Sequence, residues 1–126
     1  MNEIGDLMRP SINSISSRLT VSEALLHFLH HRVDCLLVKE SGKFAGIIYK
    51  DDIKRRIMRG KLTPETTRVY EIMTQPIPSI DLHMPIKEAS RLMVNHPIQH
   101  FAVTESGRIV GILSVKDMIS AFIKRF

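Results

Sequence analysis

The sequence has no tryptophan, two tyrosines and a single cysteine, Cys35, among its 126 residues. One cysteine excludes a disulfide within the chain and fits a reducing compartment, so we expect a cytoplasmic protein. No stretch approaches the roughly 18 consecutive apolar residues that a membrane span needs. The first ten residues are too polar for the apolar core of a secretory signal peptide. We therefore expect neither membrane insertion nor export.

Charge of one sign is in modest excess, with 18 Lys and Arg against 13 Asp and Glu and a net charge of +5. Such a balance favours an anionic partner, for example a phosphate-bearing ligand, an acidic protein or a nucleic acid. Five of the cations lie close together: Lys54, Arg55, Arg56, Arg59 and Lys61. A solvated helix face explains this cluster, and a nucleic-acid groove is the alternative. Because few aromatic residues are available to stack on bases, we do not expect nucleic acid to be the partner.

An internal repeat dominates what the sequence does contain. Shifting the sequence by 65 residues aligns residues 4–58 with residues 69–123 without a gap, and fourteen of the 55 aligned pairs are identical. Composition alone would give roughly three or four identities. Many substituted pairs are apolar in both repeats, such as Val21/Ile86, Phe28/Met93, Leu29/Val94 and Ile53/Met118. The chain is therefore two copies of one unit, and we place the repeats at residues 1–62 and 63–126.

Each repeat predicts the element order β-α-β-β-α. Apolar residues recur at i, i+3, i+4, i+7 and i+8 from Val21 to Leu29, which indicates an amphipathic helix. Thr20 and Glu23 have the spacing of a capping box at its start. Glycine in a short connection between β-rich runs indicates a hairpin. The expected segments are strands at 11–16, 35–39 and 44–49 with a closing helix from 51 or 52 to 58, and their counterparts at 76–81, 100–104, 109–115 and 116–125.

The fold class that follows is α+β. A single unit of about 55 residues would leave one face of its sheet uncovered. Two units can bury these faces against each other about a pseudo-twofold axis, and such packing creates two matching clefts lined by parts of both repeats. A cleft of this kind is a binding geometry. No nucleophile elbow, phosphate-binding loop or metalloprotease helix is found in the sequence, so we do not expect an enzyme.

The closing segments of the two repeats read GIIYKDD at residues 46–52 and GILSVKD at residues 111–117. With the preceding Met, the Glu-Ala pair of the first helix and the glycine at the hairpin tip, they resemble the tandem cystathionine-β-synthase (CBS) domain pair, or Bateman module. The resemblance covers nearly the whole chain. Each motif is weak alone, and their duplication at a fixed offset makes the match specific.

The resemblance implies a free-standing module that binds an adenosine-containing ligand such as AMP, ADP, ATP or S-adenosylmethionine. In that family the closing Asp accepts the ribose hydroxyls, the Ser or Thr three residues earlier contacts phosphate, and the other repeat contributes apolar residues around the adenine. Carried over residue by residue, the first cleft comprises Ile12, Asn13, Val33, Asp34, Ile112, Ser114 and Asp117. The second cleft comprises Ile47, Tyr49, Asp52, Ile77, Pro78, Ile98 and Gln99.

The two clefts differ in one side chain. Tyr49 places a bulky ring where the resemblance expects a small hydroxyl residue, so we favour the cleft closed by Ser114 and Asp117. The sequence also allows a plainer interpretation of that pair, because Ser-x-x-Asp is a helix-capping pattern that needs no ligand. Both interpretations remain open at the level of sequence.

Three histidines, His27, His30 and His31, lie close enough on one predicted helix to raise the question of a metal. No further ligand is placed beside them except Asp34 or Cys35, so we expect no metal site. The expected function is a regulatory sensor that modulates a partner, for example an enzyme or a transporter, and the resemblance implies a homodimer. The alternative is a dimerising protein-interaction module whose clefts are vestigial.

Overall fold

The computed structural model describes residues 3–125, with side chains described through residue 121. The chain folds into two compact units. We call them the first-repeat unit, residues 13–77, and the second-repeat unit, in which residues 3–12 join residues 78–125. Each unit has a three-stranded sheet and helices, which confirms the predicted α+β class. No helix within residues 3–125 combines the length and apolar character that crossing a membrane requires.

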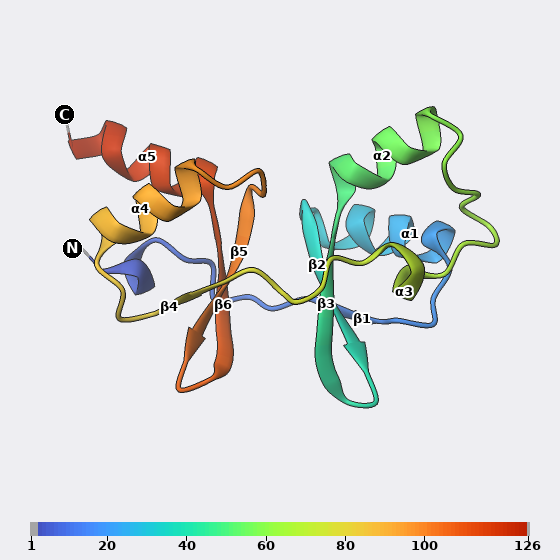
Figure 1. Cartoon of the computed structure of the whole chain (residues 1–126), viewed down its shortest axis with the longest axis horizontal. Helices are drawn as coiled ribbons and strands as arrows, with labels where there is room; N and C mark the ends of the chain where they lie inside the picture. Colours follow the sequence, from blue (N-terminus) through green and yellow to red (C-terminus); the bar gives the residue numbers. More distant parts are fainter. Residues whose placement is uncertain (1–2, 126) are drawn as a thin grey trace. The chain divides into compact units, whose positions relative to one another are not determined.

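The first-repeat unit has the strand order β1-β2-β3. Strand β2 (Cys35–Glu40) is central, pairing in parallel with β1 (Ser14–Ser16) and antiparallel with β3 (Lys43–Tyr49). Between β1 and β2 the chain forms helix α1 (Val21–His31), as a parallel connection requires. Helix α2 (Lys50–Met58) starts directly where β3 ends, and a short helix α3 (Val69–Ile72) follows (Figure 1).

The second-repeat unit has the same topology, with strand order β4-β5-β6. Strand β5 is parallel to β4 and antiparallel to β6. Figure 1 shows helices α4 and α5 lying beside each other over this sheet. The elements are the 3-10 helix η1 (Ile4–Asp6), β4 (Ser79–Asp81), α4 (Ile86–Val94), β5 (His100–Glu105), β6 (Arg108–Ser114) and α5 (Val115–Arg125).

Local sequence signals set the starts and turns of these elements as predicted. The Thr20 hydroxyl accepts a hydrogen bond from the Glu23 N–H at 3.1 Å, and the Glu23 carboxylate accepts one from the Thr20 N–H at 3.0 Å. This is the expected capping box. The hairpin between β2 and β3 turns through Ser41 and Gly42, both with positive φ, which is the backbone of a type I′ turn. Ser106 and Gly107 repeat it between β5 and β6.

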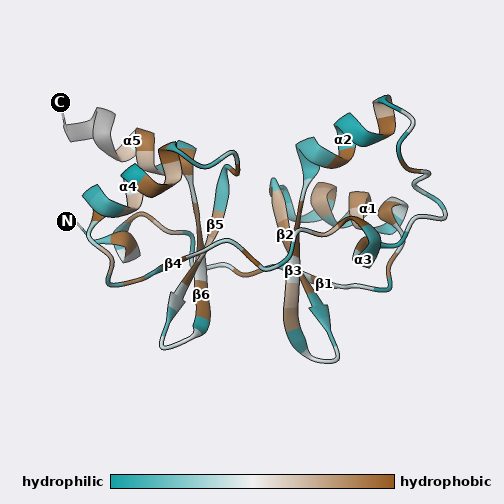
Figure 2. Cartoon of the chain, viewed as in Figure 1, coloured by the Kyte–Doolittle hydropathy of each residue, from teal (hydrophilic) through white to brown (hydrophobic). Residues whose placement is uncertain are grey.

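Each unit has its own hydrophobic core. Figure 2 shows the helices changing from hydrophilic to hydrophobic around their circumference, as amphipathic helices do. The predicted stripe of α1 is confirmed for Val21, Ala24 and Phe28, which are buried. It is wrong for Leu29, which is 75% exposed because it lies about 100° around the helix from the buried Phe28, at the outer edge of the stripe. The fully buried large side chains are Ile4, Leu36, Leu37, Ile47, Ile48, Ile53, Ile80, Met93, Phe101 and Leu113.

The segment that leads into each repeat packs with the body of the other repeat. Ile4 is fully buried in the core of the second-repeat unit, whereas Val69 and Ile72 are buried in the core of the first-repeat unit. Backbone hydrogen bonds hold both segments. Arg9 forms an antiparallel bridge with Ile112, and Thr74 and Ile47 form the equivalent bridge, which places the leading segments directly against β6 and β3.

The first strand of each repeat is shorter than predicted. We expected strands at residues 11–16 and 76–81, and β1 and β4 cover only the last three residues of each. In the second segment proline supplies the physical reason, because it has no N–H to donate to a strand ladder. Pro76 and Pro78 both lie within that segment.

Candidate functional site

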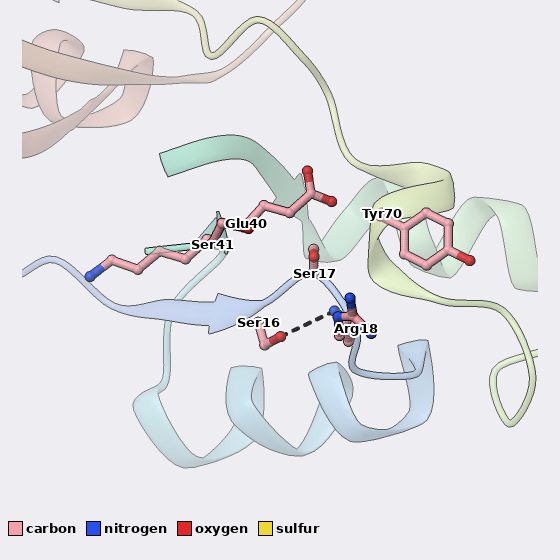
Figure 3. A pocket seen from close by; sticks show the side chains of 7 residues that line it. Ser16, Ser17, Arg18, Glu40, Ser41 and Tyr70 are labelled. Carbon is pink, nitrogen blue, oxygen red and sulfur yellow. Dashed lines mark hydrogen bonds between the residues drawn. The ribbon is translucent and has the colours of Figure 1, made fainter. Parts of the chain in front are cut away.

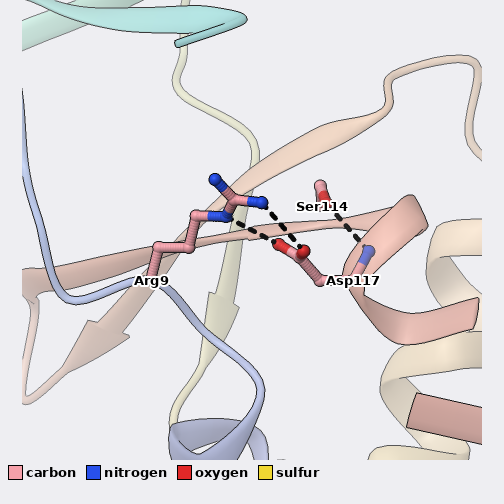
Figure 4. Close-up of polar contacts among 3 residues, drawn as sticks. All are labelled: Arg9, Ser114 and Asp117. Carbon is pink, nitrogen blue, oxygen red and sulfur yellow. Dashed lines mark hydrogen bonds and ion pairs between the residues drawn. The ribbon is translucent and has the colours of Figure 1, made fainter. Parts of the chain in front are cut away.

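The end of β6 and the start of α5 place Ser114 and Asp117 at one corner of the second-repeat unit. The helix begins at Val115, directly after the strand, so the first turn of α5 lies at the edge of the sheet. The Ser114 hydroxyl accepts a hydrogen bond from the Asp117 N–H at 2.9 Å (Figure 4). This bond caps the helix, so the capping interpretation of Ser-x-x-Asp describes the structure. The hydroxyl proton of a capping serine is still a donor for another acceptor.

Asp117 is held by a residue that the sequence did not point to. Arg9 donates from Nε to Oδ2 at 3.4 Å and from Nη2 to Oδ1 at 3.3 Å (Figure 4). The Asp117 side chain is 20% exposed and that of Arg9 is 70% exposed. A pair so open to water contributes at most about 1 kcal/mol to stability. The guanidinium of Arg9 therefore covers the Asp117 carboxylate without fixing it in place.

The carboxyl of Asp117 is ionised at neutral pH. Burial alone would raise its pKa, but the hydrogen bonding of Ser114 and Arg9 and the positive charge of Arg9 outweigh burial and lower the pKa below its ordinary value of 3.8. An ionised carboxylate only accepts hydrogen bonds and can take two neighbouring hydroxyl donors at once. The corner thus offers an anionic acceptor, a serine hydroxyl and a guanidinium within one small region.

The equivalent corner of the first-repeat unit has different chemistry. Tyr49 stands at the position of Ser114, and its side chain makes no cap to helix α2. Its ring is half-buried, and burial, with a contribution from Cys35, raises its pKa well above the usual range. Asp52 forms ion pairs with Arg56 at 3.1 Å and with Arg55 at 3.6 Å, both from its own helix. Here the carboxylate is already engaged by two cations.

Residues 33–34 and 98–99 lie directly before β2 and β5, beside these corners. In the second-repeat unit the Gln99 carbonyl accepts the N–H of Val115 at 2.8 Å, so Gln99 adjoins the start of α5. In the first-repeat unit the Asp34 carbonyl accepts the N–H of Lys50 at 2.9 Å, and the Asp34 carboxylate pairs with the same lysine at 3.2 Å. Residues 33–34 and 98–99 therefore adjoin the helix starts of their own units.

The structure distributes the predicted residues over both units. Ile98 packs against the core of the second-repeat unit, and Val33 packs against the core of the first-repeat unit. The predicted residues in the second-repeat unit are Ile12, Pro78, Ile98, Gln99, Ile112, Ser114 and Asp117. Those in the first-repeat unit are Asn13, Val33, Asp34, Ile47, Tyr49, Asp52 and Ile77. Their roles toward a ligand stay predictions.

A family model described as CBS domain matches the chain twice, over residues 4–59 and 69–124. The chain belongs to the CBS-domain family. The two matches follow the internal repeat and include both corners, with Ser114 and Asp117 in the second CBS domain and Tyr49 and Asp52 in the first. The resemblance stated from the sequence is thereby confirmed.

Relatives with CBS domains share this architecture along most of the chain. The CBS domain-containing protein YhcV of Bacillus subtilis (strain 168) is 27% identical over 118 residues, covering 94% of this chain and 84% of YhcV. Other curated relatives are longer, and the chain spans 60% of one from Methanopyrus kandleri and 20% of one from Arabidopsis thaliana. The chain thus spans most of YhcV but only part of the length of the other two relatives.

Solved structures show the same fold. An uncharacterized conserved protein from Pyrococcus horikoshii is 28% identical with a TM-score of 0.87, and the match covers 99% of this chain and 95% of that one. The CBS domain pair of protein MJ0100, solved in complex with 5′-methylthioadenosine and S-adenosyl-L-methionine, has a TM-score of 0.85 at 22% identity, covering 100% and 99% of the two chains. The second comparison establishes the fold of the pair.

Two other features of the CBS units lie away from these corners. An open polar pocket of about 320 Å³ in the first-repeat unit is lined by none of the predicted residues (Figure 3). It sits beside the β2–β3 hairpin and includes Ser17, Arg18 and Glu40. On α1 the rings of His27 and His31 stack at 5.9 Å, and among the described residues no group of three or more His, Cys, Asp or Glu side chains is arranged to hold a metal ion.

Arg9 is the functional candidate that sequence reasoning missed. It occupies the repeat position of Thr74, next to the identical pair Met8 and Met73. A change from a neutral residue to a cation, one position after an identity, is the signal that could have drawn attention to it. Its relevance depends on the bridge to Ile112, which the alignment of the repeats does not reveal.

Proposed function

We propose that this CBS pair is a regulatory module that binds an adenosine-containing ligand, of the AMP, ADP, ATP or S-adenosylmethionine class, at the corner closed by Ser114 and Asp117. The observation that carries the proposal is the ionised, largely covered Asp117 carboxylate at the start of α5. Ligand binding would modulate a partner such as an enzyme or transporter. We propose that the module is located in the cytoplasm and catalyses no reaction itself.

The chemistry of the corner suits the ribose and phosphate of such a ligand. Asp117 accepts the two vicinal ribose hydroxyls, which are the kind of paired donors that a carboxylate binds. The Ser114 hydroxyl keeps its proton for a phosphate oxygen while it caps α5. Phosphate is further favoured near the positive end of the α5 dipole. Ile12 and Ile112 of the same unit supply apolar surface for the base. Asn13, Val33 and Asp34 belong to the first-repeat unit, and their roles toward the ligand stay what the family resemblance implies.

The first repeat supports a weaker role for its own corner. Asp52 would have to exchange two arginine partners from its own helix for ribose, and the half-buried Tyr49 ring stands at the position of the phosphate-binding hydroxyl. A second site comprising Ile47, Tyr49, Asp52, Ile77, Pro78, Ile98 and Gln99 is therefore expected to be vestigial. The module would bind one ligand per chain.

A thermal-shift panel tests this function. Adenosine, AMP, ADP, ATP and S-adenosylmethionine are added separately to the full chain, with GMP and CMP as controls for base selectivity. A ligand at 100 times its dissociation constant adds about 2.7 kcal/mol to the free energy of unfolding and raises the midpoint temperature. Stabilisation by one or more adenosine compounds, but not by GMP or CMP, supports the proposal. Absence of a shift with every adenosine compound contradicts it.

Exposed apolar residues favour a second candidate, self-assembly through helices. Leu26 and Leu29 on α1 are 66% and 75% exposed, and Val94 on α4 is 73% exposed. Leu26 and Leu29 are neighbours at i and i+3 on one face of α1, and adjoining exposed apolar side chains are typical of surfaces that are buried against a partner. We infer a homodimer that uses these helices. Analytical sedimentation checks this inference by comparing wild type with the double variant Leu26→Ser/Leu29→Ser. Ser22→Ala is the control in the same helix. If the helix mediates assembly, the double variant sediments as a monomer.

A further inference from the structure

The Arg9 side chain is positioned by the backbone on which it sits. The Arg9 N–H donates to the Ile112 carbonyl at 2.8 Å, and the Ile112 N–H donates to the Arg9 carbonyl at 2.9 Å. These two bonds fix Arg9 beside Ile112 of β6, which is two residues before Ser114 in the sequence. From there its guanidinium reaches the first turn of α5, as Figure 4 shows. The arginine therefore belongs to the candidate site although it is distant in sequence.

Arg9 uses the acceptors that a ribose would need. Its two N–H groups point to both oxygens of Asp117, at 3.3 and 3.4 Å. Each oxygen has a second lone pair, but the Asp117 side chain is only 20% exposed with Arg9 in front of it, so a diol that reaches the same two oxygens displaces at least one of these contacts. The exchange is easy because the distances are at the long end for charge-assisted bonds and the arginine is 70% exposed. Once displaced, the guanidinium remains beside the helix start without its anionic partner.

We propose that Arg9 determines the ligand specificity of the module by selecting phosphorylated adenosine over unphosphorylated adenosine. In the structure Arg9 covers Asp117. When the ribose takes Asp117, Arg9 turns to the 5′-phosphate and pairs with it in place of the carboxylate. The inference rests on the proposed function and narrows its ligand class to nucleotides such as AMP.

The selectivity follows from what each ligand returns to the displaced arginine. A nucleotide removes one anionic partner from Arg9 and provides another, and guanidinium pairs with phosphate through two parallel hydrogen bonds. Adenosine and 5′-methylthioadenosine remove the carboxylate and return no anion. For these neutral ligands, breaking the Arg9–Asp117 pair is a net cost, whereas for AMP it is compensated.

The first repeat supplies an internal contrast. Thr74 takes the place of Arg9 and has the same backbone bridge, to Ile47. The cations that pair with Asp52 come instead from its own helix, at i+3 and i+4. The fold alone does not require a cation at the Arg9 position, because the equivalent bridge forms with threonine.

Titration calorimetry of the full chain at low ionic strength tests the inference, with AMP and adenosine as separate ligands. The variants are Arg9→Gln, which removes the charge, and Arg9→Lys, which keeps the charge and loses the planar fork. Arg91→Gln, an exposed arginine on α4 of the same unit, is the control for net charge. The midpoint of thermal unfolding of each variant is measured first, so that affinities are compared only between folded proteins.

Arg9→Gln is expected to weaken AMP binding by about tenfold or more, the loss of a charge-assisted hydrogen bond. The same variant tightens adenosine binding by up to about fivefold, because Asp117 no longer exchanges an ion pair that is worth little in water. The selectivity ratio is the affinity for AMP divided by the affinity for adenosine. In Arg9→Lys this ratio lies between the values of wild type and Arg9→Gln, and in Arg91→Gln it equals the wild-type value. Added salt lowers the ratio in wild type but not in Arg9→Gln.

Opposite shifts for AMP and adenosine are the signature of a selectivity residue, because a purely structural role would weaken both ligands together. If wild type binds adenosine and AMP, and Arg9→Gln changes both affinities equally or neither, the role of Arg9 is wrong while the proposed function stands. If wild type binds neither ligand, this inference is wrong, and the proposed function is wrong as well if ADP, ATP and S-adenosylmethionine also fail to stabilise the protein in the thermal-shift panel.

Discussion

Met8 lies against Gly111 so closely that a Cβ on the glycine would come within 2.6 Å of the methionine sulfur and 2.8 Å of the Arg9 carbonyl oxygen. Gly46 stands in the same relation to Met73, at 2.7 Å, and to the Thr74 carbonyl, at 2.9 Å. The glycines of the two GIIYKDD-like motifs therefore exist to let the leading segments approach the sheet. Methionine and glycine are identical in the two repeats because the same contact forms once in each unit, between Met8 and Gly111 and between Met73 and Gly46.

Gly111→Ala is expected to destabilise the protein by about 1–3 kcal/mol, because the carbonyl of Arg9 belongs to a bridged backbone that cannot yield as a flexible side chain does. Denaturant unfolding measures the change. Gly5→Ala is the control, since its new Cβ would meet only the end of the Leu82 side chain, at 3.3 Å. Equal stability of the two variants would show that the leading segment does not pack against β6 in solution.

Ser114→Ala is expected to cost about 0.5–2 kcal/mol of stability through loss of the cap on α5. Ser114→Thr keeps a hydroxyl at the cap and loses less. Thermal unfolding compares the two with Ser120→Ala, an exposed position on the same helix. A Ser114→Ala protein as stable as the Ser120→Ala control would contradict the capping bond seen in the structure.

Asp117 is expected to make folding sensitive to acid. Because its pKa is lower in the folded chain than its ordinary value of 3.8, the folded state favours the ionised form. Its contribution is therefore complete above that value and is lost as the pH falls through the folded pKa. Unfolding free energies of wild type and Asp117→Asn, measured between pH 7 and pH 2.5, should converge at the acidic end. A constant difference across this range would argue against an ionised, stabilised Asp117.

The two repeats are expected to differ in ligand stoichiometry. Calorimetry should find about one nucleotide per chain, because Asp52 is engaged by Arg55 and Arg56 and Tyr49 stands at the phosphate position. Asp52→Asn is the matched variant of Asp117→Asn, with the same change at the equivalent position of the other repeat. Two ligands per chain, or a loss of binding in Asp52→Asn equal to that in Asp117→Asn, would overturn the unequal roles of the corners.

Much of the fold was predictable because its signals are local and occur twice. The capping box of Thr20, the glycines of the hairpin turns and the apolar stripe of α1 each depend on residues a few positions apart. Leu29 was predicted wrongly because periodicity does not tell how far around the helix the core contact extends. The strand at 76–81 was predicted too long because Pro76 and Pro78 were not weighed as missing donors.

The pairing of each leading segment with the other repeat was not predictable from the repeat alone. An alignment at an offset of 65 residues shows that Met8 and Met73 are equivalent, but it carries no information on whether each contacts its own repeat or the other. Arg9 was missed for this reason, since its relation to Asp117 spans 108 positions and exists only through that pairing. The Ser-x-x-Asp motif was found, and the structure shows its capping role, whereas its ligand role stays a prediction.

Binding of AMP to wild type and to Asp117→Asn, measured side by side by calorimetry, tests the central claim most directly. The substitution preserves the size of the side chain and removes the carboxylate that is proposed to hold the ribose. We expect saturable binding to wild type and a loss of affinity of at least about tenfold in Asp117→Asn, the value of a hydrogen bond to a charged group. AMP binding of equal strength to both proteins, with both folded, would contradict the account.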